Sequence, residues 1–236
     1  QDSCGQVFLR VLHDSLFAGR GGSHLLLPRT DLGALFPEPA AHWLQQRGHA
    51  VHRGQRVQAL ARDEAGWRVD GCAFDAVLLA TSSTESARLV AEAAVPAAER
   101  PALQTWAAGA QALRFGAIAR AQRPAQFVFD RALLGGPAGL LAFVVSAFEG
   151  ERAALERDVL AQAAEDLALP GLRAVQTVVE KRATFACTPA LARPPRVIAP
   201  GLQACGDYVA GPYPATLEGA VLHGAAAAQD LGHISL

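Results

Sequence analysis

The clearest chemical pattern lies in the stretch GDYVAGPYPATLEGAVLHGAAAA, residues 206–228. Residues 202–205, just before it, have the composition of a short buried strand, which predicts Asp207 at the tip of that strand. From Thr216 onward small and apolar residues dominate, with Glu218 in the first turn, so the pattern predicts a helix packed on both sides. The sequence therefore predicts an acid at a strand end that faces the amino end of a helix.

This arrangement of an acid and a helix amino end suits one class of ligand. The first amides of a helix lack partners and carry the positive end of the helix dipole, so residues 214–217 would present donors to an anion or an electron-rich ring carbonyl. Small side chains such as Ala215 and Gly219 allow a planar ligand to approach, and Asp207 can accept hydrogen bonds from hydroxyls. The pattern indicates a nucleotide cofactor with a polyol arm. The alternative, an acid that caps a turn beside a buried helix, is favoured by sequence physics alone.

The same stretch resembles the carboxyl-terminal flavin signature of the FAD-dependent amine oxidase and phytoene desaturase superfamily. In that signature a strand ending in Gly-Asp precedes a helix that begins near Ala-Thr. Within the superfamily the chain is most similar to the hydroxysqualene dehydroxylases, also called squalene-associated FAD-dependent desaturases. The resemblance covers nearly all of the 236 residues and is carried by three stretches: VLHDSLFAGRGGSHLLLPRTDLGALFPEPAAHWL, EKRATFACTP and GDYVAGPYPATLEGAV.

The resemblance implies an activity as well as a fold. It implies an FAD-dependent oxidoreductase of hopanoid biosynthesis in which hydride from reduced FAD replaces the hydroxyl of hydroxysqualene and yields squalene. An isoprenoid desaturase of the phytoene type or an amine oxidase remains an alternative within the superfamily. A chain that binds lipid or a partner without catalysis is the alternative from another class.

The resemblance also implies a set of cofactor-binding residues: Val57, Thr81, Gly206, Asp207, Tyr213, Pro214, Ala215 and Thr216. Asp207 would bind the ribityl or pyrophosphate region of FAD, and residues 213–216 would lie against the flavin ring. The backbone at Val57 would meet the adenine, and Thr81 would lie near the phosphates. Each has a plain structural alternative: Val57 as a core strand residue and Thr81 as a helix cap. The sequence names no catalytic residue.

The chain also departs from the family pattern. Full members begin with a strand, a GxGxxG turn and a helix that holds the FAD pyrophosphate. Here GRGGS at residues 19–23 has the wrong spacing, and LLGGPAG at residues 133–139 lies in the central region. The chain contains no Met and opens on a polar tip that runs into an amphipathic segment. We therefore expect the carboxyl-terminal portion of a longer flavoenzyme, and FAD retention by this portion alone is left open.

The expected fold class is α/β: an FAD/NAD(P)-binding flavoprotein fold that lacks its first βαβ unit and carries an inserted α+β substrate domain. The expected division is residues 1–24 as a substrate-domain segment, 25–90 as part of the FAD-binding domain, 91–195 as the substrate domain and 196–236 as the carboxyl-terminal part of the FAD-binding domain.

Hydrophobic periodicity and turn residues predict the individual elements. Helices are expected after Thr30 or Asp31 with an end at Gly48, after Thr81 with a Ser or Thr cap, around Trp106, and over residues 151–169. Strands are expected in these ranges: 56–63, 66–71, 74–81, 112–121, 127–130, 140–148, 174–181 and 196–207. In the helix over 151–169 the apolar side chains share one face, as a helix lying on a sheet requires.

Composition limits the classes of partner and compartment. A net charge of −1 and a pI near 6.7 exclude the basic field that nucleic acid requires. The four scattered cysteines form no CxxC pair and no metal-ligand spacing, which predicts reduced, mostly packed thiols in a cytoplasmic protein without a metal site. No apolar run is long enough to cross a bilayer, although a long isoprenoid substrate is compatible with peripheral contact at the inner membrane face. Lys181, the single lysine, and His24 receive no catalytic role.

Overall fold

The computed structural model describes residues 4–17, 19–21, 24, 26–115, 123–146, 148 and 150–232. The chain forms two compact units. The first unit comprises Gln1–Gly22, Arg56–Ile118 and Lys181–Leu236, and the second comprises Ser23–Gln55 and Ala119–Glu180. The protein is of the mixed α/β type, with small sheets and seven α-helices in the described part of the chain.

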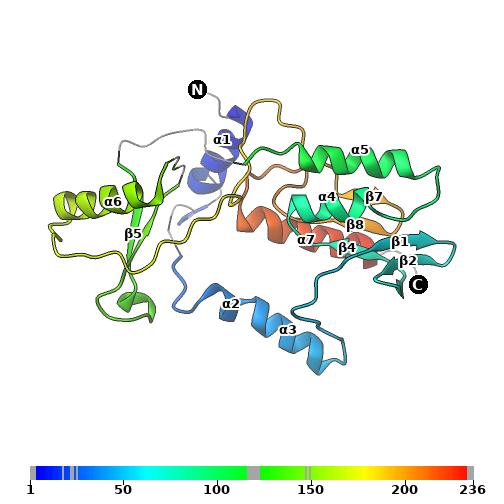
Figure 1. Ribbon diagram of the computed structural model, residues 1–236, viewed down its shortest axis with the longest axis horizontal. Helices are drawn as coiled ribbons and strands as arrows, with labels where there is room; N and C mark the ends of the chain where they lie inside the picture. The colour runs from blue at the N-terminus through cyan, green and yellow to red at the C-terminus, as the bar shows by residue number, and fades with distance from the viewer. Residues whose placement is uncertain are drawn as a thin grey trace. The chain divides into compact units, whose positions relative to one another are not determined.

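The first unit contains most of the regular structure (Figure 1). Its helical elements are α1 (Gly5–Leu12), the π-helical turn η1 (His13–Phe17), α4 (Ser83–Ala91), α5 (Arg100–Gln111) and α7 (Leu217–Gly232). Its strands are β1 (Leu60–Asp63), β2 (Gly66–Val69), β3 (Cys72–Phe74), β4 (Val77–Leu79), β7 (Val197–Ala199) and β8 (Leu202–Ala204).

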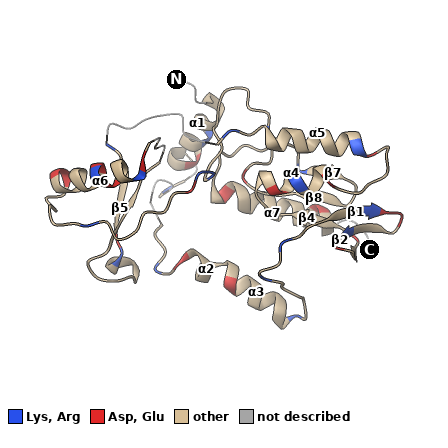
Figure 2. Cartoon of the chain, viewed as in Figure 1, with Lys and Arg blue, Asp and Glu red and all other residues tan. Residues whose placement is uncertain are grey.

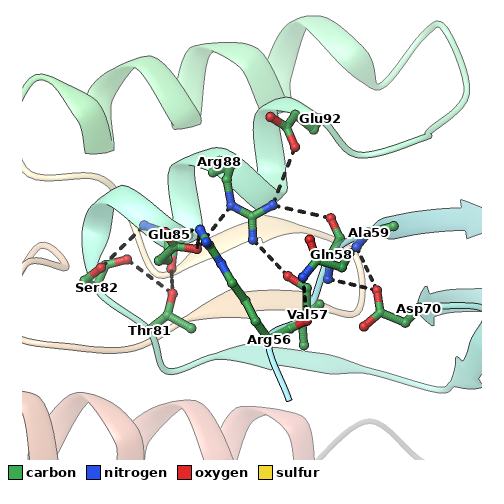
Figure 3. Close-up of polar contacts among 11 residues, drawn as sticks. Arg56, Val57, Gln58, Ala59, Asp70, Thr81, Ser82, Glu85, Arg88 and Glu92 are labelled. Atoms are coloured by element: carbon green, nitrogen blue, oxygen red, sulfur yellow. Dashed lines mark hydrogen bonds and ion pairs between the residues drawn. The ribbon is translucent and has the colours of Figure 1, made fainter. Parts of the chain in front are cut away.

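Two three-stranded sheets organise this unit. Strands β1, β2 and β3 form an antiparallel meander, whereas the second sheet has the order β4-β8-β7. Strand β8 pairs with β4 in parallel, with Leu79 opposite Ala204, and with β7 in antiparallel orientation. Helices α4 and α5 lie over one face of the second sheet, and α7 lies on the other side (Figures 1 and 3). Because helices cover both faces of this parallel pair, its strands are rich in apolar residues. Strand β4 reads VLL, and β8 reads LQA with one glutamine.

Two tryptophans connect the core to the chain segments that enter β7 and β8. Trp67 is 1% exposed and donates its indole N–H to the carbonyl of Pro200 at 2.9 Å. Trp106 is 6% exposed and donates to the carbonyl of Pro195 at 2.8 Å. Buried indoles need such partners because an unpaired buried N–H is costly. Both bonds join residues far apart in sequence: the bond to Pro195 fixes the path into β7, and the bond to Pro200 fixes the path into β8.

The observed units differ from the predicted domain boundaries. Residues 91–118 and 181–195, predicted in the substrate domain, belong to the first unit, and residues 25–55, predicted in the FAD-binding domain, belong to the second. The reason is packing: Trp106 of α5 is buried in the core that contains β8, and Phe115 forms a β-bridge with Phe185. Burial of large side chains, not proximity in sequence, determines the division.

The second unit contains α2 (Leu32–Leu35), α3 (Pro37–Gln46), β5 (Phe127–Asp130), the 3₁₀ turn η2 (Ala132–Leu134), β6 (Leu141–Val144) and α6 (Arg152–Asp166). Strands β5 and β6 pair in antiparallel orientation. Asp31 caps α2 by accepting the amide of Ala34 at 2.9 Å, and the helical segment breaks at Pro37, which has no amide hydrogen to continue the ladder. Gly48 follows α3 with a φ of 81°, so the predicted cap and end of this helical segment are confirmed.

Several predicted elements are confirmed and some are wrong. The segment 174–181 forms no strand, and Val175 and Val178 are 73% and 81% exposed. The spacing of apolar residues in this segment favours a strand, but none of the described strands pairs with it. Residues 116–121 of the strand predicted at 112–121 lie outside the described residues, and of the rest only Phe115 makes a β-bridge.

Helix α7 is not packed on both sides as the sequence predicts. Its buried residues are Gly219, His223 and Ala227, on one face, whereas Leu217 is 73% and Val221 65% exposed. Figure 2 shows α7 almost free of charge along its length, in contrast to α6, where acids and bases alternate. Among the described residues no helix combines the length and hydropathy that a transmembrane span requires.

Candidate functional site

The parallel strands β4 and β8 end at one edge of their sheet, where several predicted site residues lie. The amide of Cys205, directly after β8, donates to the carbonyl of Leu79 at 3.0 Å. A Cβ placed on Gly206 would lie 3.9 Å from the carbonyl oxygen of Thr81. Thr81 and the Gly206–Asp207 turn are therefore neighbours at the carboxyl edge, which is where α/β proteins bind ligands.

Glycine is the residue type that fits position 206 in this turn. Its φ is 152°, in the region that favours glycine, and a Cβ there would lie 2.8 Å from the ring of Tyr208. The ring of Tyr208 thus occupies the space that a side chain at position 206 would need. The glycine of the Gly-Asp pair is required by the fold whether or not a ligand binds.

A buried hydrogen-bond relay connects the turn after β8 to the start of α4. The phenol of Tyr208 donates to Ser86 Oγ at 2.8 Å, and Ser86 Oγ also shares a hydrogen bond of 2.8 Å with Thr81 Oγ1. Burial raises the pKa of Tyr208 to about 12, because the phenolate would lose its hydration. Ser82 caps α4 by accepting the amide of Glu85. Thr81 is therefore held as a hydroxyl partner in the relay, and its neighbour Ser82 acts as the cap.

Val57 is joined to the same helix by an arginine network (Figure 3). Arg88 of α4 donates to the carbonyl of Val57 at 2.9 Å and to Glu85 at 3.1 Å. Arg56 makes two bonds to the Glu85 carboxylate, at 2.7 and 2.9 Å, and these cations lower the pKa of Glu85. The segment before β1 is thus fastened to the helix that follows Thr81. The carbonyl of Val57 already serves a protein donor.

Asp207 is partly buried and lacks a strong partner for its carboxylate. Burial raises the pKa of Asp207, and the backbone amides of Tyr208 and of Asp207 itself oppose that rise, as do the charges of Arg193 and His223. Among the described residues no side chain donates a hydrogen bond to this carboxylate. A partly buried acceptor with spare lone pairs fits a ligand that carries hydroxyl donors.

Arg193 is the organising residue of this region. Its guanidinium donates to the carbonyls of Asp207 at 3.2 Å and Tyr213 at 2.7 Å, and also to the carbonyl of Gly211. It lies over the ring of Phe185, 5.5 Å from the ring centroid. Desolvation by burial lowers the pKa of Arg193. The loop 207–213 therefore wraps around one cation that sequence reasoning missed.

The amino end of α7 is built from the predicted residues 213–216. Thr216 Oγ1 accepts the amide of Gly219 at 3.1 Å and caps the helix. Tyr213, Pro214 and Thr216 line a hollow of about 540 Å³ together with residues of α1 and η1. Ala215 packs against the core and does not line this hollow.

Tyr213 already has a partner on its ring. The guanidinium of Arg10 lies over this ring, 4.5 Å from the centroid, and donates to the phenol oxygen at 2.6 Å. Arg10 is in turn paired with Asp14 at 2.8 Å. In this arrangement Arg10 covers one face of the Tyr213 ring, so that face is not available to a planar ligand.

His223 fills the space between the turn after β8 and the second turn of α7. It is 8% exposed, and its Nδ1 lies 2.5 Å from the carbonyl oxygen of Gly206. A Cβ on Gly211 would lie 2.4 Å from its Nε2. The predicted residues thus divide: Thr81, Gly206 and Asp207 meet at the carboxyl edge of β4 and β8, whereas Tyr213 lies beneath the guanidinium of Arg10.

A larger cavity of about 840 Å³ adjoins the loop on the side of α1. Its walls are mostly apolar and come from α1, the segment 185–193 and residues 210–213. Arg10, His13 and Arg193 are the basic side chains at this cavity. A cavity of this size and composition accommodates an apolar small molecule.

Lys181 and His24 are both exposed. Among the described residues no cluster of His, Cys, Asp and Glu has the geometry of a metal site. Comparison with protein-family models, with curated proteins and with solved structures gave no match.

Proposed function

We propose that the chain is part of an FAD-dependent oxidoreductase that acts on a long isoprenoid, with reductive dehydroxylation of hydroxysqualene to squalene as its reaction. The proposal rests on the resemblance of three long sequence stretches to the hydroxysqualene dehydroxylases. The observation that carries it in the fold is the parallel pairing of β4 with β8, which brings Thr81 and Asp207 to one edge. An FAD-binding fold without its first βαβ unit is the finer fold assignment that goes with it.

Each residue at this edge has a specific role in the proposal. Asp207 accepts hydrogen bonds from ribityl hydroxyls, because its carboxylate has no side-chain donor among the described residues. The amino end of α7 faces the pyrimidine side of the ring with its positive dipole. Arg193 keeps Asp207 and Tyr213 in one loop conformation. Bound FAD would supply hydride transfer, while these residues bind and orient it.

The apolar cavity beside the loop supports an apolar substrate. It is lined largely by aliphatic and aromatic side chains, among them Val7, Leu12, Phe185 and Leu191. A hydrocarbon chain enters such a space because its burial removes apolar surface from water. An isoprenoid desaturase would use the same cavity with hydride transfer in the opposite direction, from substrate to FAD.

A second candidate is a chain that binds lipid without catalysis. The observation that favours it is the position of Arg10. Its guanidinium covers a face of the Tyr213 ring that we expected to contact the flavin. In that case the cavity alone is functional, and the strand edge serves only the fold.

An absorbance spectrum of the protein after incubation with FAD and gel filtration separates the two candidates. The flavin proposal predicts a bound flavin band near one equivalent. The flavin-loaded protein is then reduced with dithionite and given hydroxysqualene, and squalene is measured by gas chromatography. Squalene formation supports the dehydroxylase, whereas a flavin-loaded protein that makes none contradicts it. A colourless protein that still retains a squalene-like hydrocarbon favours the lipid-binding candidate.

A further inference from the structure

Two cysteines that are 183 positions apart in the chain lie next to each other in the wall of the apolar cavity. The amide of Cys4 donates to the carbonyl of Cys187 at 2.9 Å, and both residues line the cavity of about 840 Å³. A direct backbone hydrogen bond holds two residues side by side, with Cα atoms roughly 5–6.5 Å apart. That separation lies inside the range that a disulfide requires, roughly 4.4–6.8 Å.

The two thiols differ from the other cysteines of the chain. Cys4 and Cys187 are both free and partly exposed, whereas Cys205 is buried and Cys72 is exposed on β3. The prediction of mostly packed thiols is confirmed for Cys205, and Cys187 is partly buried against the core, whereas it is wrong for the exposed Cys72. Arg193 lines the same cavity as Cys4 and Cys187.

A disulfide between Cys4 and Cys187 would act on a helix that has few buried contacts. Helix α1 has no buried residue. Among the described residues, two hydrogen bonds join α1 and its N-cap Cys4 to the segments beyond η1: the backbone bond between Cys4 and Cys187, and the bond of Arg10 to Tyr213. Few buried contacts make an element prone to local opening, and α1 forms one wall of the cavity.

We propose that Cys4 and Cys187 are a redox-sensitive pair whose oxidation to a disulfide fastens α1 over the apolar cavity. The oxidant is a hydroperoxide. One thiolate attacks the hydroperoxide oxygen, becomes a sulfenic acid and releases an alcohol or water. The second thiol then attacks the sulfenic sulfur, forms the S–S bond and releases water. Two thiols are oxidised, one hydroperoxide is reduced, and a thiol reductant reverses the change.

The test uses the whole reduced protein, one equivalent of hydrogen peroxide, a maleimide block and tryptic peptide mapping by mass spectrometry. The proposal predicts a linked pair of peptides, one containing Cys4 and ending at Arg10, the other containing Cys187. We expect it to form at least about tenfold faster than any disulfide that includes Cys72. The Cys72→Ser variant should behave as the wild type, and Cys4→Ser should abolish the linked pair. Oxidation of Cys72 while Cys4 and Cys187 both remain maleimide-labelled would overturn the proposal.

Hydrogen exchange provides a second readout that is independent of which disulfides are detected. Oxidation should slow exchange of the α1 amides by about tenfold or more, and dithiothreitol should restore it. The Cys187→Ser variant is the control and should show no change with peroxide. A linked wild-type protein whose α1 amides exchange as fast as in the reduced state would refute the fastening of the helix.

Discussion

The phenol of Tyr208 donates a 2.8 Å hydrogen bond to Ser86 Oγ, and this contact joins the turn after β8 to helix α4. Tyr208 is 3% exposed and Ser86 is fully buried. Because Ser86 also bonds Thr81, the two sides of the candidate site share one relay. The relay makes the position of Asp207 depend on a side chain adjacent to it in sequence.

Tyr208→Phe tests this relay through pH. The pKa of Tyr208 is raised from 10 to about 12, so the folded state holds the proton more tightly than the unfolded chain. The resulting stability is fully present below pH 10 and is lost as the pH rises through about 12. Wild type should therefore lose about 2–3 kcal/mol more than Tyr208→Phe over this interval. Urea unfolding at several alkaline pH values measures the difference, and parallel curves for the two proteins would refute the burial of this phenol.

Gly206→Ala tests the close packing of the turn. The φ of 152° and the contact of a Cβ with the Tyr208 ring at 2.8 Å predict a loss of about 2–4 kcal/mol in the free energy of unfolding. Gly71→Ala is the matched control, since Gly71 has a φ of 86° but open space around it. It should cost only about 1–2 kcal/mol, the backbone penalty alone. Equal losses at the two positions would mean that Tyr208 does not pack against Gly206.

Arg193→Lys tests the loop that wraps around the guanidinium. Lysine keeps the charge but cannot donate in a planar fork to the carbonyls of Asp207, Gly211 and Tyr213. We expect a loss of about 2–3 kcal/mol in the free energy of unfolding. Arg68→Lys, at an exposed pair with Asp63, should cost less than about 1 kcal/mol in the same urea titration. An unchanged free energy of unfolding in Arg193→Lys would argue against the hydrogen bonds from this guanidinium to the three carbonyls.

Asp207→Asn should leave the fold intact. Since burial raises the pKa of Asp207, its protonated form contributes stability that is complete below the unfolded pKa of 3.8 and is lost as the pH rises through the folded value. At pH 7 the ionised carboxylate therefore opposes folding, and the asparagine variant should be at least as stable as the wild type. Thermal unfolding at pH 7 checks this, and a lowered midpoint would reveal a structural role for the charge.

Local patterns were sufficient for much of the fold. The Ser82 cap, the break at Pro37 and the end of a helix at Gly48 follow from residue chemistry within a few positions. The segment 174–181 shows the limit of such patterns, because a strand needs a partner that its own sequence does not specify. Val175 stays exposed there despite its β propensity.

The parts of the site that escaped prediction depend on distant contacts. Arg193 bonds carbonyls that any sequence would provide, so no residue type signals its role. Arg10 reaches Tyr213 from the other end of the chain. The Gly-Asp pair was recognisable because its chemistry lies in two consecutive residues. The role of Arg193 depends instead on the folded conformation of the loop 207–213, which brings distant carbonyls to its guanidinium.

Titration of the protein with FAD, followed by quenching of flavin fluorescence, tests the central claim most directly. Wild type, Asp207→Asn and Asp75→Asn are compared, the last being an exposed acid at the opposite end of β4. The account predicts saturable binding by wild type and Asp75→Asn, and at least about tenfold weaker binding by Asp207→Asn, the loss expected for one charge-assisted hydrogen bond. Equal affinity of all three proteins, or no binding by any of them, would contradict the assignment of this strand edge as a flavin site.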